Sequence, residues 1–368
     1  MPELCILFAG GGTGGHLFPA IAIADELRSQ QPAAEIHFVG TKDRIEARVV
    51  PQLGYAFHSI WISGFRRSFR LSNLLFPLKV IVSFMQSVSI IRKIKPNVVV
   101  GTGGYVSGPV LRAAVLCNIP TLIQEQNSYP GVTTRMLAPK VDEVHVTFES
   151  SLQYLSGKSN IHVSGNPTRN MLAGAEKKEA LNYFGFDEKS GAVTLLVVGG
   201  SLGAHSINTA VIGCLERLVG RGLRIIWQTG KEDLRQAVEA AGPYPDSTIW
   251  VSSFIDRMDY AYAAADVVLC RAGATSLAEL TRLGKPSILV PYPHAAADHQ
   301  TENARALASA GAAIVLPDDA AGAGLEEAVV SLLDPKRRSE MSKASAALGR
   351  PEAAAEIAQR VLSLAGKR

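Results

Sequence analysis

The sequence predicts an α/β protein of two doubly wound domains, each built on a parallel sheet, that face each other across a cleft. Its length of 368 residues suggests two domains. Short apolar runs alternate with helical patterns along the whole chain, as in parallel α/β sheets. Glycine-rich segments follow several of these runs, where a strand would pass into a helix.

In the first half of the chain the pattern predicts seven strands separated by helices, for example over 14–30, 71–93 and 107–117. The segment 164–169, which contains Gly165 and Pro167, interrupts the pattern and is interpreted as a domain junction. The predicted strands are 4–9, 35–39, 57–61, 97–101, 120–124, 142–146 and 161–163.

The pattern restarts at residue 193 and predicts a second domain. We expect domains at 1–165 and 166–350, with the helix 351–368 packing back on the first. The predicted strands of the second half are 193–198, 223–228, 248–251, 266–270, 287–290 and 313–315.

The charge distribution suggests an anionic partner for the first domain. Between Glu46 and Glu125 there are nine Lys and Arg residues and no acidic residue. The four cysteines lie scattered in apolar runs without C-x-x-C spacing, which favours reduced thiols over disulfides or a zinc framework.

Four strand–glycine–helix segments, 10–16, 101–109, 199–204 and 271–279, are the main functional signal. Any one of them alone could be a tight turn, but backbone amides at a helix start also form an anion site. Four such segments, two in each half, favour a diphosphate ligand. Ligands of open α/β sheets bind at the carboxyl ends of strands, where these segments lie.

The first segment also matches the dinucleotide fingerprint through Gly10, Gly12 and Gly15. A nicotinamide oxidoreductase stays an alternative, although the second strand ends at Gly40 without the acidic residue that would hold the ribose. The chain has no Walker motif, no D-x-D and no zinc spacing. We therefore expect no cofactor and no catalytic metal.

Several polar residues follow predicted strands, and each has a functional and a purely structural interpretation. His16 is a candidate general base or a surface residue, and Glu125 is a rival base or a loop-anchoring carboxylate. Glu279 is a candidate acceptor of hydrogen bonds from a ribose or sugar diol, or it is a solvated helix residue. Gln300 suits sugar hydroxyls or is polar because it begins a helix, and Arg169 is a phosphate clamp or an interdomain ion-pair partner.

These motifs resemble the GT-B glycosyltransferases, whose two domains are Rossmann-like, and within them the bacterial family that transfers N-acetylglucosamine to undecaprenyl-pyrophosphoryl-N-acetylmuramoyl-pentapeptide. The resemblance runs in order along the whole chain. It is carried by Gly10–His16 with Pro19, Gly101–Pro109, Gln124–Asn127, Gly165–Pro167 with Arg169, Gly199–Ala204, Phe254-Ile255, Arg271–Glu279, and Gln300 with Asn303.

The resemblance implies an inverting transferase that moves N-acetylglucosamine from UDP-N-acetylglucosamine to the C4 hydroxyl of the lipid-linked muramoyl pentapeptide. Its sugar-nucleotide site would use Ile255 for the uracil, Glu279 for the ribose and Gln300 for the sugar. The diphosphate would be held by Ser201, Ala274, Thr275 and Ser276, and Leu277 and Ala278 would also contribute to substrate binding. From the first domain, Thr13, Gly14, Gly15, Asn127 and Arg169 would complete the site, with His16 or Glu125 as the base.

The resemblance also implies a lipid-anchored acceptor, which matches the basic, apolar stretch from Trp61 to Lys95. That stretch is either an ordinary amphipathic helix or a dock for an anionic membrane surface. Polar residues interrupt it, so it does not predict a membrane span. We expect a peripheral protein on the cytoplasmic face of the bacterial inner membrane.

Two other function classes stay open at this point. A UDP-N-acetylglucosamine 2-epimerase would share the fold and donor site but needs no lipid acceptor. A nucleic-acid-binding module would use the basic stretch but leaves the glycine segments unexplained, so we expect no nucleic-acid partner.

Overall fold

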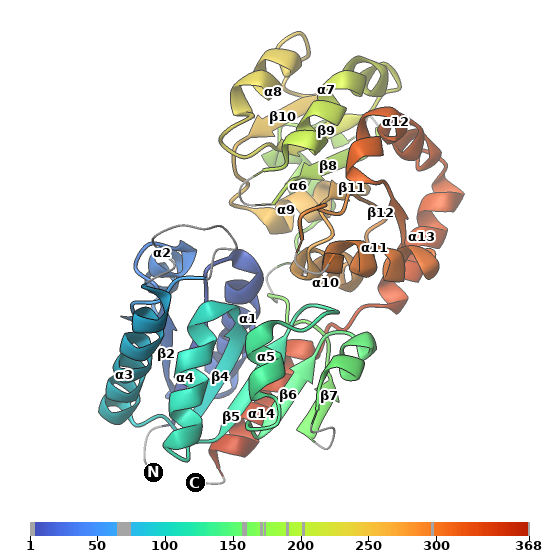
Figure 1. Cartoon of the computed structure of the whole chain (residues 1–368). Helices are drawn as coiled ribbons and strands as arrows, with labels where there is room; N and C mark the ends of the chain where they lie inside the picture. Colours follow the sequence, from blue (N-terminus) through green and yellow to red (C-terminus); the bar gives the residue numbers. More distant parts are fainter. Residues whose placement is uncertain are drawn as a thin grey trace. The chain divides into compact units, whose positions relative to one another are not determined.

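The computed structural model describes residues 4–64, 75–156, 160–169, 172, 174–188, 191–200, 203–295 and 298–366. The chain divides into two compact units (Figure 1). Unit 1 consists of Met1–Arg169 with Arg350–Arg368, and unit 2 of Asn170–Gly349.

Unit 1 is built on a parallel sheet of seven strands in the order β3-β2-β1-β4-β5-β6-β7. This doubly wound order brings the carboxyl ends of neighbouring strands to one edge of the sheet. The strands are β1 Cys5–Gly10, β2 Glu35–Gly40, β3 Ala56–Ser59, β4 Val98–Gly103, β5 Thr121–Glu125, β6 Glu143–Val146 and β7 Ile161–Val163.

Helices cover both faces of this sheet, and β1 shows why. Its side chains alternate, so Ile6 and Phe8 pack into one apolar core while Leu7 and Ala9 pack into another. The first core includes α1 and α14, and the second includes α3 and α4. The helices are α1 Gly14–Gln30, α2 Ile45–Gln52, α3 Phe76–Ile94, α4 Gly104–Leu116, α5 Val132–Leu137 and α14 Ala353–Ala365, with a 3-10 helix at Glu149–Tyr154.

The C-terminal helix α14 is joined to this sheet by polar contacts as well as by apolar packing. Arg360 donates from Nε and Nη2 to the carboxylate of buried Glu143, at 3.0 and 2.5 Å. Ser164 donates to Glu356 at 2.5 Å. His145, which is fully buried, contacts both Glu143 and Ser164. The end of the chain therefore belongs to unit 1.

Unit 2 has a parallel sheet of six strands in the order β10-β9-β8-β11-β12-β13. Leu195 and Leu196 on β8 point into separate cores on the two faces. The strands are β8 Thr194–Val198, β9 Arg224–Gln228, β10 Ile249–Ser252, β11 Val267–Cys270, β12 Ser287–Leu289 and β13 Ala313–Val315. The helices are α6 Lys177–Tyr183, α7 His205–Gly220, α8 Leu234–Ala241, α9 Met258–Ala264, α10 Ala274–Arg282, α11 His299–Ser309, α12 Ala321–Ser331 and α13 Pro335–Ala347, with a 3-10 helix at Asp318–Ala320.

The predicted fold class is confirmed, because two doubly wound parallel sheets are present and every predicted strand occurs within two residues of its expected bounds. Within the described ranges, no helix is long and apolar enough to cross a bilayer.

Candidate active site

The imidazole of His16, in the first turn of α1, is oriented by the residue that follows β5. Its Nδ1 lies 2.9 Å from Oε1 of Gln126. The Gln126 amide nitrogen donates to the carbonyl oxygens of Thr102 and Gln124, at 2.8 and 3.1 Å. Because an amide nitrogen only donates, the Gln126 amide oxygen is the atom that faces the ring. Nδ1 therefore carries the hydrogen, and the lone pair of neutral His16 is on Nε2.

The turn between β4 and α4 makes room for this ring. Sequence reasoning expected a glycine loop over 101–109, but β4 runs to Gly103 and α4 begins at Gly104, so Pro109 lies inside the helix. Gly103 has φ 101°, and a Cβ there would lie 2.7 Å from Nδ1 of His16. Thr102 also donates to the His16 carbonyl at 2.8 Å. The glycines of this segment therefore leave the space that the His16 ring occupies.

A buried carboxylate that sequence reasoning missed holds the first glycine segment. Glu46, on the first turn of α2, is 1% exposed. Its Oε2 accepts from the backbone N–H of Gly12 at 3.0 Å, and its Oε1 accepts from the N–H and hydroxyl of Thr41 at 3.1 and 2.9 Å. A Cβ at Gly11 would lie 2.5 Å from Oε1. Gly11 is therefore required by Glu46, and the Gly12 amide is already engaged.

The amides that remain available in this segment lie at the start of α1. Thr13 is the N-cap residue, with extended backbone and no side-chain cap hydrogen bond. Thr13 and Gly15 are exposed, and Gly14 lies half-buried between them. The first amides of a helix have no intrahelical acceptor, so this end of α1 favours an anion.

Glu125, the predicted rival base, is 3% exposed and accepts hydrogen bonds on both carboxylate oxygens. Oε1 accepts from the backbone and side-chain nitrogens of Asn127, at 3.0 and 3.2 Å. Oε2 accepts from the N–H of Gly131 at 3.0 Å and the hydroxyl of Thr134 at 2.6 Å. This is the contact pattern of a carboxylate that anchors the loop between β5 and α5.

Arg169, at the end of the described segment after β7, stacks over the ring of Phe18 on α1 at 4.7 Å from its centroid. Its Nε is buried and has no hydrogen-bond partner among the residues that the structure describes. The aromatic contact holds the guanidinium beside α1.

In unit 2, one glutamine joins two of the predicted donor-site segments. Gln228, the last residue of β9, donates to the carbonyl of Gly200 at 2.9 Å and accepts from the N–H of Ile255 at 2.9 Å. Ile255 is buried, and this contact engages its backbone N–H. Ser201 lies outside the described residues. Sequence reasoning missed Gln228, although a polar residue at the end of an apolar strand could have indicated it.

The helix α10 begins at the carboxyl end of β11 and presents the other predicted donor-site residues. Its N-cap, Gly273, has no side chain, so the amides of the first turn are uncapped. Two turns in, Glu279 accepts a hydrogen bond from the hydroxyl of Tyr262 at 2.8 Å, which orients its carboxylate. Leu277 packs into the apolar core and Ala274 is buried, whereas Thr275, Ser276, Ala278 and Glu279 are half-buried.

Arg271, between β11 and α10, connects the segments around Gln300 through hydrogen bonds. Its guanidinium donates to Asp318 at 2.5 Å, to Ser206 at 2.9 Å, and to two carbonyls of the segment after β12. That segment includes Tyr292, whose N–H donates to Oε1 of Gln300 at 3.0 Å. The contact engages the amide oxygen of Gln300 and not its amide nitrogen.

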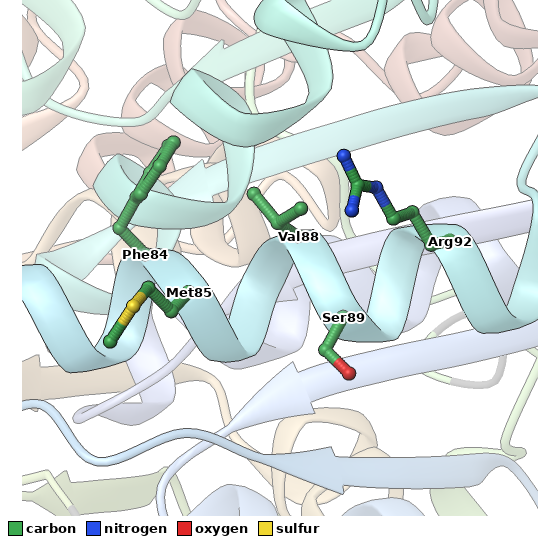
Figure 2. Close-up of a pocket in the computed structure, with 5 residues that line it drawn as sticks. All are labelled: Phe84, Met85, Val88, Ser89 and Arg92. Atoms are coloured by element: carbon green, nitrogen blue, oxygen red, sulfur yellow. The ribbon is translucent and has the colours of Figure 1, made fainter.

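A groove of about 420 Å³ lies on α3 in unit 1, lined by Phe84, Met85, Val88, Ser89 and Arg92 (Figure 2). The exposed apolar side chains of α3 continue from it along the helix. Leu78, Ile81 and Met85 are 49%, 56% and 57% exposed. Arg66, Arg67 and Arg70, which belong to the basic stretch predicted from Trp61 to Lys95, lie outside the described residues.

Comparison with known proteins agrees with this geometry. The family profile described as "Glycosyltransferase family 28 N-terminal domain" matches residues 6–146, and "Glycosyltransferase family 28 C-terminal domain" matches residues 194–361. A solved MurG from Acinetobacter baumannii is 28% identical, with a TM-score of 0.76 over 98% of this chain and 100% of that chain. A solved UDP-N-acetylglucosamine 2-epimerase is 16% identical, with a TM-score of 0.65, over 100% and 98% of the two chains. That likeness supports the fold alone.

The fold and both matching domains define a glycosyltransferase with the GT-B fold. The UDP-N-acetylglucosamine--N-acetylmuramyl-(pentapeptide) pyrophosphoryl-undecaprenol N-acetylglucosamine transferase of Chlorobaculum parvum is 50% identical over 365 residues, covering 98% of this chain and 99% of the relative. The same transferase of Salinibacter ruber is 46% identical over 364 residues, covering 98% and 97%. The chain belongs to this transferase family within glycosyltransferase family 28.

Proposed function

We propose that this protein transfers N-acetylglucosamine from UDP-N-acetylglucosamine to the muramoyl C4 hydroxyl of undecaprenyl-pyrophosphoryl-N-acetylmuramoyl-pentapeptide, a step of peptidoglycan synthesis. Relatives with that activity in their names share about half of their residues with this chain over 98% of its length. The solved 2-epimerase shares only the fold, so the relatives favour the transferase over the epimerase alternative.

The observation that carries the chemistry is the contact between His16 and Gln126. It leaves Nε2 of His16 unprotonated and able to accept the proton of the acceptor hydroxyl. The acceptor oxygen then bonds to C1 of N-acetylglucosamine as the bond from C1 to the diphosphate oxygen breaks, and UDP leaves with the bonding electrons. Attack opposite the leaving group inverts the configuration at C1.

Glu125 is the weaker candidate for the base. Its two oxygens already accept four hydrogen bonds, which occupy about all the lone-pair positions that a carboxylate offers. We assign it the role of holding the loop that carries Asn127.

In unit 2 the donor would bind at the carboxyl ends of the strands. The uncapped start of α10, with the predicted Ser201, would meet the diphosphate, whose developing charge needs backbone dipoles. Glu279 would accept from the ribose hydroxyls, the Ile255 carbonyl would meet the uracil, and Gln300 would donate to the sugar. In unit 1, Thr13, Gly14, Gly15 and Arg169 would lie beside the reacting groups.

A transfer assay tests this proposal. Wild-type protein is given radiolabelled UDP-N-acetylglucosamine with and without a muramoyl diphospholipid analogue. We expect label in the lipid product only, and a turnover about 100-fold lower or more in His16→Ala with UDP-N-acetylglucosamine affinity retained. Epimerised sugar formed without acceptor would contradict the transfer. A near-normal rate in His16→Ala would remove the histidine from the mechanism.

We further propose that α3 docks on an anionic membrane surface at the cytoplasmic face of the inner membrane. Its exposed apolar side chains could enter the interface, while Arg92 and Lys93, both exposed, would meet anionic head groups. Trp61 is 45% exposed, and its ring lies 5.6 Å from the Lys79 ammonium, a pairing that suits the interface.

Vesicle sedimentation tests the membrane proposal. On phosphatidylglycerol vesicles, Ile81→Glu combined with Met85→Glu should weaken binding by about tenfold or more, because two apolar groups are replaced by charges of the same sign as the lipid. The matched control is Val238→Glu on α8 of unit 2, where the valine is 51% exposed. Equal binding of all three proteins would contradict the assignment.

A further inference from the structure

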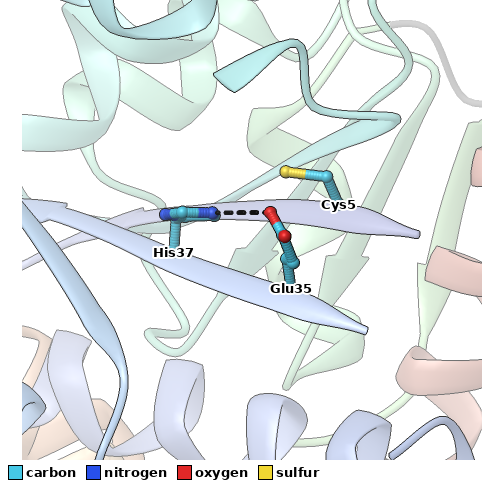
Figure 3. A group of neighbouring side chains, drawn as sticks. All are labelled: Cys5, Glu35 and His37. Carbon is cyan, nitrogen blue, oxygen red and sulfur yellow. Dashed lines mark ion pairs between the residues drawn. The ribbon is translucent and has the colours of Figure 1, made fainter. Parts of the chain in front are cut away.

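Three side chains at the beginning of β1 and β2 form a cluster of metal-binding donors, at the opposite end of β1 from the first glycine segment. Cys5 and Glu35 are register partners on the two parallel strands, and His37 follows Glu35 by two residues. All three therefore project from the same face of the sheet (Figure 3). Their ligand atoms, one from each residue, all lie within 4.8 Å of one another.

The spacing of these donors suits a small divalent cation. Nε2 of His37 lies 3.5 Å from a carboxylate oxygen of Glu35. Two ligands at about 2.0–2.1 Å from a tetrahedral zinc ion are separated by roughly 3.4 Å. A thiolate, an imidazole and a carboxylate are also the three side-chain ligand types that zinc uses.

A fourth residue can orient the imidazole for such a cation. The other ring nitrogen of His37, Nδ1, lies 3.1 Å from Nε2 of His58 on β3. When His58 accepts this hydrogen bond, the hydrogen of His37 is on Nδ1 and the Nε2 lone pair faces Cys5 and Glu35. An outer partner of this kind is a general feature of metal-binding histidines.

We propose that Cys5, Glu35 and His37 bind a zinc-type divalent cation, with water as the fourth ligand. The Glu35 side chain is 56% exposed and gives the ion a way in, whereas Cys5 is buried in the wall of the site. The ion would displace the thiol proton on binding. It would join β1 to β2, apart from the transfer chemistry at His16.

Cobalt(II) tests the site, because its thiolate complexes have a charge-transfer band in the near ultraviolet. The full chain, kept reduced, is titrated with cobalt(II) and then with zinc(II). We expect a band that zinc abolishes. The affinity should fall about tenfold or more in Glu35→Gln, where an exposed side chain is changed, and the band should be lost in Cys5→Ala. The control is Cys117→Ala, since Cys117 is a partly exposed thiol outside the cluster.

The outcomes separate the proposed site from adventitious binding. A band that is present in the wild type and in Cys117→Ala but absent in Cys5→Ala supports the proposal, provided that circular dichroism shows all variants folded. If Cys5→Ala does not fold, the affinity loss in Glu35→Gln decides. No thiolate band, or a band and affinity unchanged in Glu35→Gln, would overturn it.

Discussion

Nδ1 of His16 lies 2.9 Å from the amide oxygen of Gln126, and the Gln126 amide nitrogen is held by the carbonyls of Thr102 and Gln124. The glutamine thereby selects the tautomer of the histidine. Gln126 contacts only Nδ1 of the imidazole, and this contact decides that Nε2 is the ring nitrogen able to accept a proton.

We predict that Gln126→Ala lowers kcat by about tenfold or more with little change in the KM for UDP-N-acetylglucosamine, because the imidazole is no longer held in the reactive tautomer. Gln126→Glu keeps an acceptor at Nδ1 and adds a charge that favours imidazolium, so it should move the acid limb of the kcat profile to higher pH. Steady-state kinetics from pH 5 to 9 measures both. An unshifted profile in Gln126→Glu would argue for a purely structural glutamine.

A second prediction concerns Glu46, which accepts three hydrogen bonds beneath the first glycine segment. Glu46→Ala leaves the amides of Gly12 and Thr41 and the Thr41 hydroxyl without their acceptor in a buried site. We expect the free energy of unfolding to fall by about 3 kcal/mol, measured by urea denaturation.

Glu46→Gln separates geometry from charge. It keeps one acceptor oxygen and nearly the same volume, so it should recover part of the stability, and of the kcat, that Glu46→Ala loses when the glycine segment before His16 is released. The exposed acid Glu239 on α8 provides a control, since Glu239→Gln should change neither quantity appreciably. If Glu46→Ala were as stable as the wild type, the carboxylate would not be holding the segment.

The third prediction concerns the pair Tyr262 and Glu279. Removing the tyrosine hydroxyl in Tyr262→Phe should raise the KM for UDP-N-acetylglucosamine about threefold to tenfold and leave kcat nearly unchanged, because Glu279 is no longer oriented toward the ribose. In Glu279→Ala the same tyrosine substitution should have almost no further effect. Additive effects in this double-mutant cycle would show that Tyr262 does not act through Glu279.

The sequence predicted the fold well because its signals are local. Apolar runs end at glycines and restart as helices, so each strand could be placed within two residues. The prediction of a loop over residues 101–109 was wrong, because Gly103 and Gly104 turn the chain so tightly that α4 begins at once.

Contacts between distant segments could not be predicted in this way. Glu46 reaches Gly12, and Gln228 reaches Ile255, only through the pairing of strands and the packing of their loops. Cys5, Glu35 and His37 have no metal-site spacing along the chain, and only the register of β1 with β2 brings them together. The roles of the candidate site residues remain predictions.

The last prediction concerns pH and the attachment of α14. Burial opposes ionisation of Glu143, but hydrogen bonds from Arg360 and His145 outweigh it, so the pKa of Glu143 lies below its ordinary value. Burial also lowers the pKa of His145. Both groups therefore bind protons more readily in the unfolded chain, and stability should be lost as the pH falls. The loss begins near the ordinary histidine pKa of about 6.5 and grows below the ordinary glutamate pKa of about 4.3.

Arg360→Leu tests this assignment, because it leaves Glu143 buried without its cation. The free energy of unfolding at pH 7 should fall by about 2 kcal/mol, less than for a fully buried pair because the Arg360 side chain is 43% exposed. The pKa of Glu143 should rise, so that the acid-dependent loss near pH 4 becomes smaller than in the wild type. Arg305→Leu removes an exposed pair with Glu302 and should change stability by less than about 0.5 kcal/mol at either pH. Urea denaturation at pH 7 and pH 4 compares the three proteins. If the free energy of unfolding fell between the two pH values by the same amount in Arg360→Leu as in the wild type, the contact between α14 and Glu143 would not contribute to the acid response.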